Sequence, residues 1–101
     1  MEKTRLELDL KERMLYINGR QGPSLDSTLY DGEAFTKDVD YLELRYRTDD
    51  PEVVVEDSER INDALERQGL EEYVSVCPCP ENPGEDYLAI GLYGNFEANV
   101  R

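Results

Sequence analysis

Two stretches of the chain alternate polar and apolar residues with a period of two, and this pattern limits the fold more than any other feature. They run from Arg5 to Leu10 and from Tyr41 to Thr48. Successive side chains of a strand point to opposite faces of a sheet, so the alternation predicts strands with one buried face. In the second stretch the buried face would carry Leu42, Leu44 and Tyr46. The pattern favours a mainly antiparallel sheet, whose outer face can contact water.

Three more strands are predicted, at Met14 to Ile17, Tyr73 to Cys77 and Tyr87 to Tyr93. The first forms a hairpin with the Arg5 stretch and ends at the turn dipeptide Asn18-Gly19. The valines of the strand from Tyr73 to Cys77 are expected to face the leucines and isoleucine of the strand from Tyr87 to Tyr93 on the core side. Residues 22–33 are rich in turn formers and are predicted to form a loop. A short helical turn is expected near residues 32–37.

One helix is predicted, from Ser58 to Gln68, where apolar residues recur at helical spacing. Asp57 or Ser58 is the expected N-cap. Gly69 follows where a left-handed residue commonly ends a helix, so Leu70 would pack on Leu65 in a Schellman motif. The run of three valines before the predicted helix is ambiguous between a short strand and an extended linker.

The resulting order of elements is β-β-loop-β-α-β-β. It predicts an α+β fold with a mainly antiparallel sheet of about five strands and one helix packed on one face. The predicted strand from Tyr41 to Thr48 ends at Asp49-Asp50-Pro51. Proline stops the strand there, because it lacks an N–H donor and restricts the conformation of the residue before it. The 101 residues fit a single domain, 1–101.

The composition argues against several classes of function. The chain has no histidine, which removes the usual general base and the commonest metal ligand. No apolar run approaches the roughly 20 residues that span a membrane, and the N-terminus lacks the apolar stretch of a signal peptide. A cytoplasmic protein that binds no membrane is expected. No enzyme and no cofactor are expected, because no carboxylate pair stands out for catalysis and no glycine pattern matches a phosphate loop.

Both cysteines lie in one short motif, Val76-Cys77-Pro78-Cys79-Pro80. A zinc site usually takes four cysteine or histidine ligands, and a reactive thiol usually has a cation nearby. The local sequence instead is acidic, and prolines cannot donate to a sheet ladder. We therefore expect the strand to end after Cys77, with Cys77 a small buried residue. A disulfide between the two cysteines is conceivable but would be strained.

Other metal and nucleic-acid signals are weak. Asp31-Gly32-Glu33 and Asp38-Val39-Asp40 have carboxylates but no EF-hand spacing, so no metal site is expected. A basic patch with an interleaved aromatic residue occurs only at Arg45-Tyr46-Arg47, where the arginines are expected to pair with carboxylates of neighbouring strands. Direct binding to nucleic acid is not expected, since the net charge is −13.

The negative charge is concentrated in one part of the chain. From Asp49 to Glu72 there are ten acids, two arginines and no lysine. On the predicted helix, Glu59, Asp63 and Glu66 fall on one narrow stripe opposite the apolar face. The candidate partner-binding residues in this segment are Asp49, Asp50, Glu52, Glu56, Glu59, Asp63, Glu66, Glu71 and Glu72.

These acids suggest a partner with a basic surface, such as a nuclease or a nucleic-acid-binding effector. The leading hypothesis is a small acidic inhibitor that mimics nucleic acid, of the kind that phages use against host defence (anti-CRISPR or anti-restriction proteins). An immunity protein that neutralises a basic nuclease toxin would use the same attraction between an acidic surface and a basic site, so it is the alternative. A viral or assembly protein is a further alternative. A solvated acidic helix is a further alternative. The concentration of charge in one segment weighs against a halophile-type acidic surface, although the preference for arginine over lysine would fit such a source. The protein is expected to be a monomer or a homodimer.

Overall fold

Eight strands and one helix make up the part of the chain that the structure describes. The computed structural model describes residues 4–9, 11–25, 35–36, 41–46, 50–79 and 88–100. In chain order the elements are β1 (Thr4–Asp9), β2 (Met14–Ile17), β3 (Arg20–Ser24), β4 (Phe35–Thr36), β5 (Tyr41–Tyr46), α1 (Pro51–Arg67), β6 (Val74–Cys79), β7 (Leu88–Gly94) and β8 (Phe96–Val100). The α+β class predicted from the sequence is confirmed.

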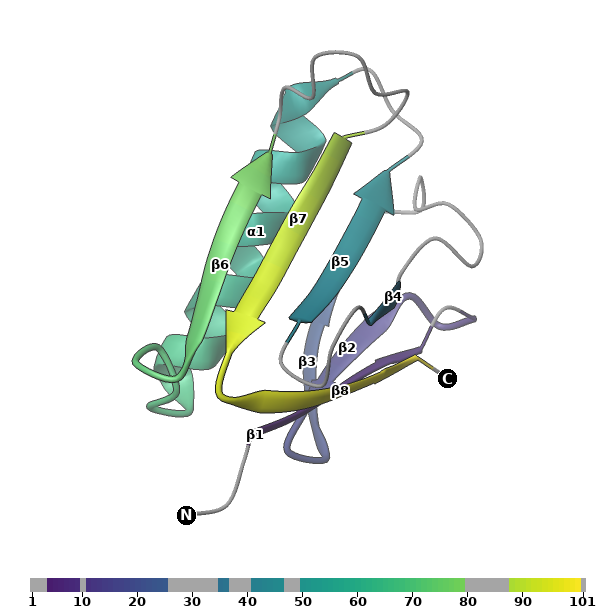
Figure 1. Ribbon diagram of the computed structural model, residues 1–101. Helices are drawn as coiled ribbons and strands as arrows, with labels where there is room; N and C mark the ends of the chain where they lie inside the picture. Colours follow the sequence, from purple (N-terminus) through teal and green to yellow (C-terminus); the bar gives the residue numbers. More distant parts are fainter. Residues whose placement is uncertain are drawn as a thin grey trace.

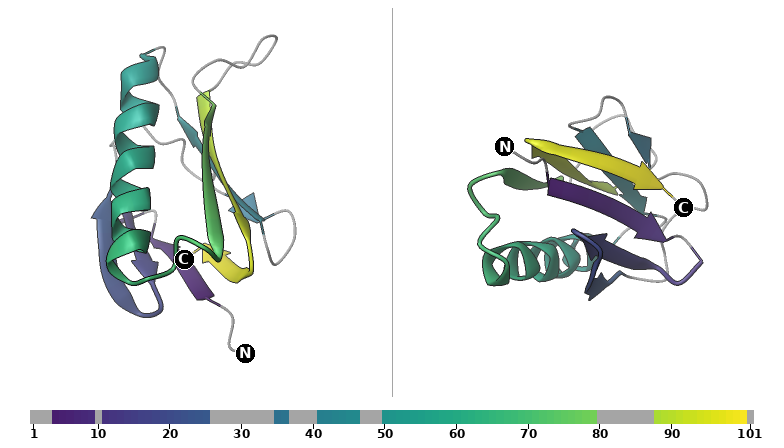
Figure 2. Two further views of the ribbon diagram at one scale, coloured as in Figure 1. Left: turned by 90° about the vertical axis from the view of Figure 1, so that its left-hand side faces the viewer. Right: turned by 90° about the horizontal axis from the view of Figure 1, so that it is seen from below.

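The strands form two sheets, so the prediction of one sheet of about five strands is wrong in this respect. Sheet A has the order β3-β2-β1-β8, and sheet B has the order β4-β5-β7-β6. All neighbouring strands are antiparallel except β1 and β8, which are parallel. The helix α1 runs alongside sheet B and contacts β6, β7 and the edge strand β3 of sheet A (Figures 1 and 2). One helix therefore contacts both sheets.

The core lies between the two sheets and α1. The alternating residues of β1 and β5 face it as predicted, and Leu6, Leu8, Leu42 and Leu44 are buried. The buried hydrophobic residues of α1 are Val54, Ile61 and Leu65, and those of β7 include Ile90 and Leu92. Because apolar side chains from three layers, the two sheets and α1, meet here, loss of any one layer would expose the other two.

The predicted hairpin of β1 and β2 is confirmed, with Leu8 paired to Leu15. Asn18 and Gly19 both have positive φ, at 53° and 77°, as a tight I′ turn requires. This turn leads into β3. The loop predicted for residues 22–33 therefore begins too early, since Gly22–Ser24 belong to this strand. Residues 35–36 form a strand and not the expected helical turn.

Helix α1 begins at Pro51, earlier than the predicted start at Ser58. Asp50 is the N-cap, and its carboxylate accepts a hydrogen bond of 3.0 Å from the Glu52 N–H. Backbone N–H groups in the first turn of a helix have no carbonyl partner within the helix. Proline, which lacks an N–H, is therefore favoured there. The ambiguous valine run is therefore helical, and Val54 is buried on the core side.

The end of α1 matches its prediction. Gly69 has a φ of 70°, and the Leu70 N–H donates to the Leu65 carbonyl over 2.9 Å. The Gly69 N–H donates to the Glu66 carbonyl over 3.0 Å, which completes the Schellman motif. This stop turns the chain back toward β6 with no long connection.

A sharp corner at Gly94 carries the chain from sheet B into sheet A. Gly94 has a φ of 144°, and a Cβ on it would overlap the carbonyl oxygen of Tyr73. The next N–H, that of Asn95, donates to the same carbonyl over 2.8 Å. Strand β8 then crosses below sheet B to lie beside β1 (Figure 1). This strand was not predicted from the sequence.

We expect Gly94→Ala to destabilise the protein by more than about 3 kcal/mol, because backbone strain of up to about 3 kcal/mol adds to overpacking of about 1–3 kcal/mol. Gly69→Ala is the matched control, since Gly69 also has positive φ but no atom lies within 4 Å of its added Cβ. The control should lose only about 1–2 kcal/mol. Urea unfolding of the two variants measures both values, and equal losses would contradict the tight corner.

Candidate functional site

Five acidic residues line one side of α1 and form what we call the acidic stripe. The early start of the helix adds two acids to the three predicted from the sequence. The stripe consists of Glu52, Glu56, Glu59, Asp63 and Glu66, all of them exposed. At about 100° per residue they fall within roughly 80° of arc. From Glu52 to Glu66 the stripe extends about 21 Å along the helix axis.

No carboxylate of the acidic stripe has a hydrogen-bond or ion-pair partner within the described part of the chain. Each acid follows the previous one by three or four residues, the spacing at which like charges repel on a helix. Four such neighbouring pairs oppose helix formation by about 1–2 kcal/mol in total. The charges in the last turns also lie toward the negative end of the helix dipole. The stripe therefore does not stabilise the helix that carries it.

The other predicted partner-binding residues lie around the ends of the helix. Asp50 is exposed and caps the N-terminus, where its negative charge is favourable. Glu71 and Glu72 are exposed in the turn that follows the helix. Asp49 lies outside the described residues. The structure brings the five helical acids together in a line and leaves the remaining three described acids at its two ends.

Asp57 is a correction to the sequence analysis, which expected Asp57 or Ser58 to be the N-cap of the helix. It is only 1% exposed. Its carboxylate accepts a hydrogen bond of 2.8 Å from the Tyr46 hydroxyl and another of 2.8 Å from Arg60. A buried carboxylate needs such partners, because an unpaired charge in the core is strongly unfavourable. The hydrogen bond between Asp57 and Tyr46 thus links α1 to strand β5.

We expect Tyr46→Phe to lower the free energy of unfolding by about 1–3 kcal/mol, because it removes a donor from the buried Asp57 carboxylate. Tyr16→Phe is the control, since the Tyr16 hydroxyl donates to the exposed Glu12 carboxylate. Surface changes of this kind stay within about 0.5 kcal/mol. Chemical denaturation compares the two variants, and a neutral Tyr46→Phe would contradict a structural role for the buried pair.

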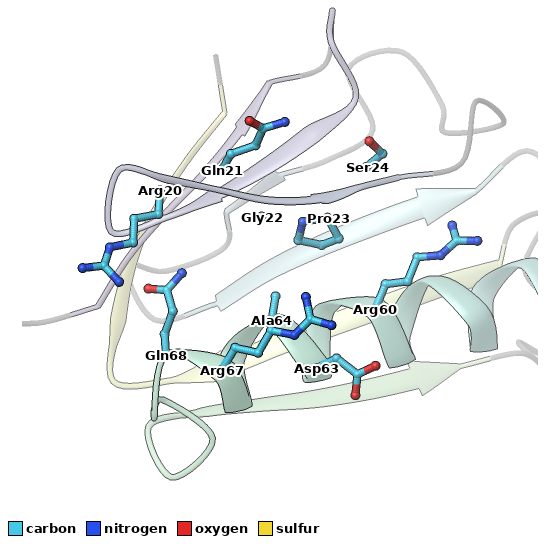
Figure 3. Close-up of a pocket in the computed structure, with 10 residues that line it drawn as sticks. All are labelled: Arg20, Gln21, Gly22, Pro23, Ser24, Arg60, Asp63, Ala64, Arg67 and Gln68. Carbon is cyan, nitrogen blue, oxygen red and sulfur yellow. The ribbon is translucent and has the colours of Figure 1, made fainter.

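The two arginines of α1 lie beside the acidic stripe and face β3. Arg60 pairs with Asp57 over 2.8 Å, and the pairing with Glu56 that the spacing allowed does not form. Asp63 and Arg67 also form no ion pair. With Arg20 of β3, the two helical arginines line a cavity of about 540 Å³ between β3 and α1 (Figure 3). Sequence reasoning missed this cavity because β3 was predicted to be part of a loop.

The cysteines lie on the outer face of sheet B, which corrects the prediction for Cys77. Cys77 is exposed, Cys79 is partly buried, and both are free thiols. Val74 and Val76 occupy the core face of β6, so the alternation of the strand turns both cysteines outward. The strand also continues through Pro78, because β6 is an edge strand and one side of it needs no N–H donor.

The cysteines help to line a shallow hollow of about 280 Å³ on this outer face. Ala89 and Gly91 of the central strand form part of its lining, with Tyr41, Glu43 and Tyr93 around them. Glu43 accepts hydrogen bonds of 2.6 Å from Tyr41 and 2.8 Å from Arg45. Arg45 thus pairs with a carboxylate of its own strand, β5, and not with one of a neighbouring strand as predicted. Arg47 itself lies outside the described residues.

The pKa of Tyr93 is raised above its ordinary value, first by a hydrogen bond to the Cys77 thiol. Repulsion between a Cys77 thiolate and a tyrosinate raises this pKa further, and burial adds a smaller effect. The two residues lie on neighbouring strands, since Cys77 pairs with Gly91 and Ser75 pairs with Tyr93. This contact links the edge strand to the centre of sheet B on its solvent side.

We expect Cys77→Ala to bring the pKa of Tyr93 down toward about 10, because the variant removes both effects of the thiol on the tyrosinate. Cys79→Ala is the matched control and should leave this pKa raised. The measurement is a pH titration of the Tyr93 ring signals by NMR, assigned with Tyr93→Phe. An unchanged Tyr93 titration in Cys77→Ala would rule out the contact.

Within the described residues, no group of three or more cysteine, aspartate or glutamate side chains could hold a metal ion. The weak candidates at residues 31–33 and 38–40 lie outside the described residues. The helix α1 is too short and too polar to cross a membrane, and it is the only helix that the described residues form. No protein-family model, no curated protein and no solved structure matches this chain. The candidate site is therefore argued from its own geometry.

Proposed function

We propose that this protein is a small, non-enzymatic acidic inhibitor whose helix α1 occupies a basic nucleic-acid-binding site on another protein. The acidic stripe is the observation that carries the proposal. Its five carboxylates are exposed, aligned and without partners in the described chain. They oppose the stability of their own helix, so solubility alone gives little reason to place them in one line. A basic partner removes this repulsion on binding.

The spacing of the stripe supports a comparison with nucleic acid. Neighbouring acids are about 4.5 to 6 Å apart along the axis, and one DNA strand carries a phosphate about every 3.4 Å of its axis. The stripe is therefore a sparser row of charges that can contact several basic side chains of one groove. Such contacts speed association through electrostatic steering and weaken as salt is added. The proposed target is a nuclease or a nucleic-acid-binding effector of the cytoplasm, as an anti-defence protein of a phage would meet.

Charge alone gives little net affinity, so the interface also needs an apolar anchor. Tyr73 is 39% exposed and follows Glu71 and Glu72 just beyond the C-terminal end of α1. Among Tyr41, Tyr73 and Tyr87, it is the best placed for this role. Tyr41 is partly buried and donates to Glu43, while Tyr87 lies outside the described residues. We propose that Tyr73 supplies the anchor beside the acidic stripe.

The test measures binding to a panel of basic nucleases and nucleic-acid-binding effectors at several salt concentrations. The variant Glu59→Gln/Asp63→Asn/Glu66→Gln should bind its target at least about tenfold more weakly, with a shallower dependence on salt. Its thermal stability should be unchanged or higher, because repulsion within the helix is removed. Bound nucleic acid should also be displaced from the target by the unmodified protein.

The control, Glu12→Gln/Glu97→Gln, removes two exposed acids that lie away from α1, one in the β1–β2 turn and one in β8. It should keep most of the affinity. Tight binding that ignores both salt and the helical variant would overturn the mechanism. The identity of the target in the panel separates an anti-defence protein from an immunity protein, because only the latter protects cells from a co-expressed nuclease toxin.

A further inference from the structure

We infer that the cavity between β3 and α1 binds a compact anion with two or more phosphate groups. The cavity, called here the arginine pocket, has a volume of about 540 Å³. This is within the range of small-molecule sites. Three arginines line it, Arg20 from β3 and Arg60 and Arg67 from α1 (Figure 3). The arginine pocket adjoins the acidic stripe at Asp63, which belongs to both, but the inference does not depend on the proposed inhibitor function.

Arginines outnumber acids among the described residues of the arginine pocket. In Figure 3 the side chains of Arg67 and Gln68 point from the helix toward β3, while Arg20 at one end and Arg60 at the other extend outward, away from each other. Among the lining residues that the structure describes, Asp63 is the one acid, and its carboxylate points away from β3 (Figure 3). The pocket is therefore lined by positive charge in a chain whose net charge is −13.

The hydrogen-bonding capacity of these arginines is largely unused. Asp63 precedes Arg67 by four residues, the spacing that favours an ion pair on a helix, yet the two form none. Arg20 and Arg67 have no hydrogen-bond or ion-pair partner in the described part of the chain. Arg60 gives one nitrogen to Asp57 and is 54% exposed. Each guanidinium has five N–H donors, so most of them remain available to a ligand.

The chemistry of the lining restricts the class of ligand. Guanidinium groups bind phosphate in a two-pronged geometry. The Gln68 side chain adds an uncharged donor beside them, whereas the side chains of Gln21 and Ser24 point away from α1 (Figure 3). None of the described lining residues is aromatic, so they offer no surface on which a nucleobase could stack. Arg60 and Arg67 are about 10 Å apart along the helix axis, so a ligand that reaches both needs more than one anionic group. A short polyphosphate chain, free or attached to a nucleoside, has these properties.

The overall field of the protein opposes such a ligand, and this sets the conditions of the test. At an ionic strength of about 0.15 M the Debye length is about 8 Å, so the distant acids are screened while contacts inside the pocket persist. The helix C-terminus near Arg67 also disfavours an anion. A single phosphate is therefore expected to bind more weakly than a chain that reaches two or three arginines.

The experiment titrates tripolyphosphate into the isotope-labelled full chain at about 0.15 M salt and follows amide signals by NMR. Saturable shifts are expected in β3 and in the C-terminal half of α1. Arg20→Gln and Arg67→Gln should each weaken binding about tenfold, and orthophosphate should bind at least tenfold more weakly than tripolyphosphate. Lys11→Gln is the control. Lys11 is exposed in the β1–β2 turn, so this substitution removes one positive charge away from the arginine pocket.

The outcomes separate the sources of the phosphate chain. ATP that binds as well as tripolyphosphate supports a nucleoside polyphosphate, and ATP that fails to bind supports a free chain. Citrate that binds as tightly as tripolyphosphate would overturn the phosphate class. An equal loss of affinity in Lys11→Gln, or no saturable shift at millimolar tripolyphosphate, would overturn the site itself. The arginine variants leave the acidic stripe intact, so their result is independent of the inhibitor test.

Discussion

The corner at Gly94 is the constraint on which the two-sheet structure depends. Strands β7 and β8 are consecutive in the chain, yet β7 is the central partner of sheet B and β8 is an edge of sheet A. The chain changes sheets within one residue, and only a residue without a Cβ fits beside the Tyr73 carbonyl there. Because β8 pairs with β1, this corner joins the end of the described chain to its beginning. It also closes the core over Phe96, which is fully buried.

The helix is divided into three sides by the elements around it. One side packs into the core through Val54, Ile61 and Leu65. A second faces β3 with Arg60 and Arg67, and the third carries the acidic stripe toward solvent. Opposite charges thus lie next to each other on one helix without neutralising each other, except where Arg60 meets Asp57. This separation gives the molecule two surfaces of opposite sign, which suit different ligands.

The sequence predicted the elements whose signals are local. The period-two strands at Leu42–Tyr46 and Leu6–Leu8 and the Gly69 helix stop each depend on a few neighbouring residues, and these were correct. Strand β8 depends on a long-range parallel pairing with β1, and no short pattern indicates such a partner. The start of α1 was missed because three valines favour strands in isolation, whereas the burial of Val54 in the core outweighs that preference.

The two surfaces show why candidate residues were only partly predictable. The acidic stripe follows from helical spacing, so three of its members could be found before the start of α1 was known. The arginine pocket depends on Arg20 lying opposite Arg60 and Arg67, residues far apart in the sequence, and on β3 being a strand. Cys77 differs from both, because the core positions of Val74 and Val76 already imply that it faces outward. There the alternation of the strand is a stronger guide than the general tendency of cysteine to be buried.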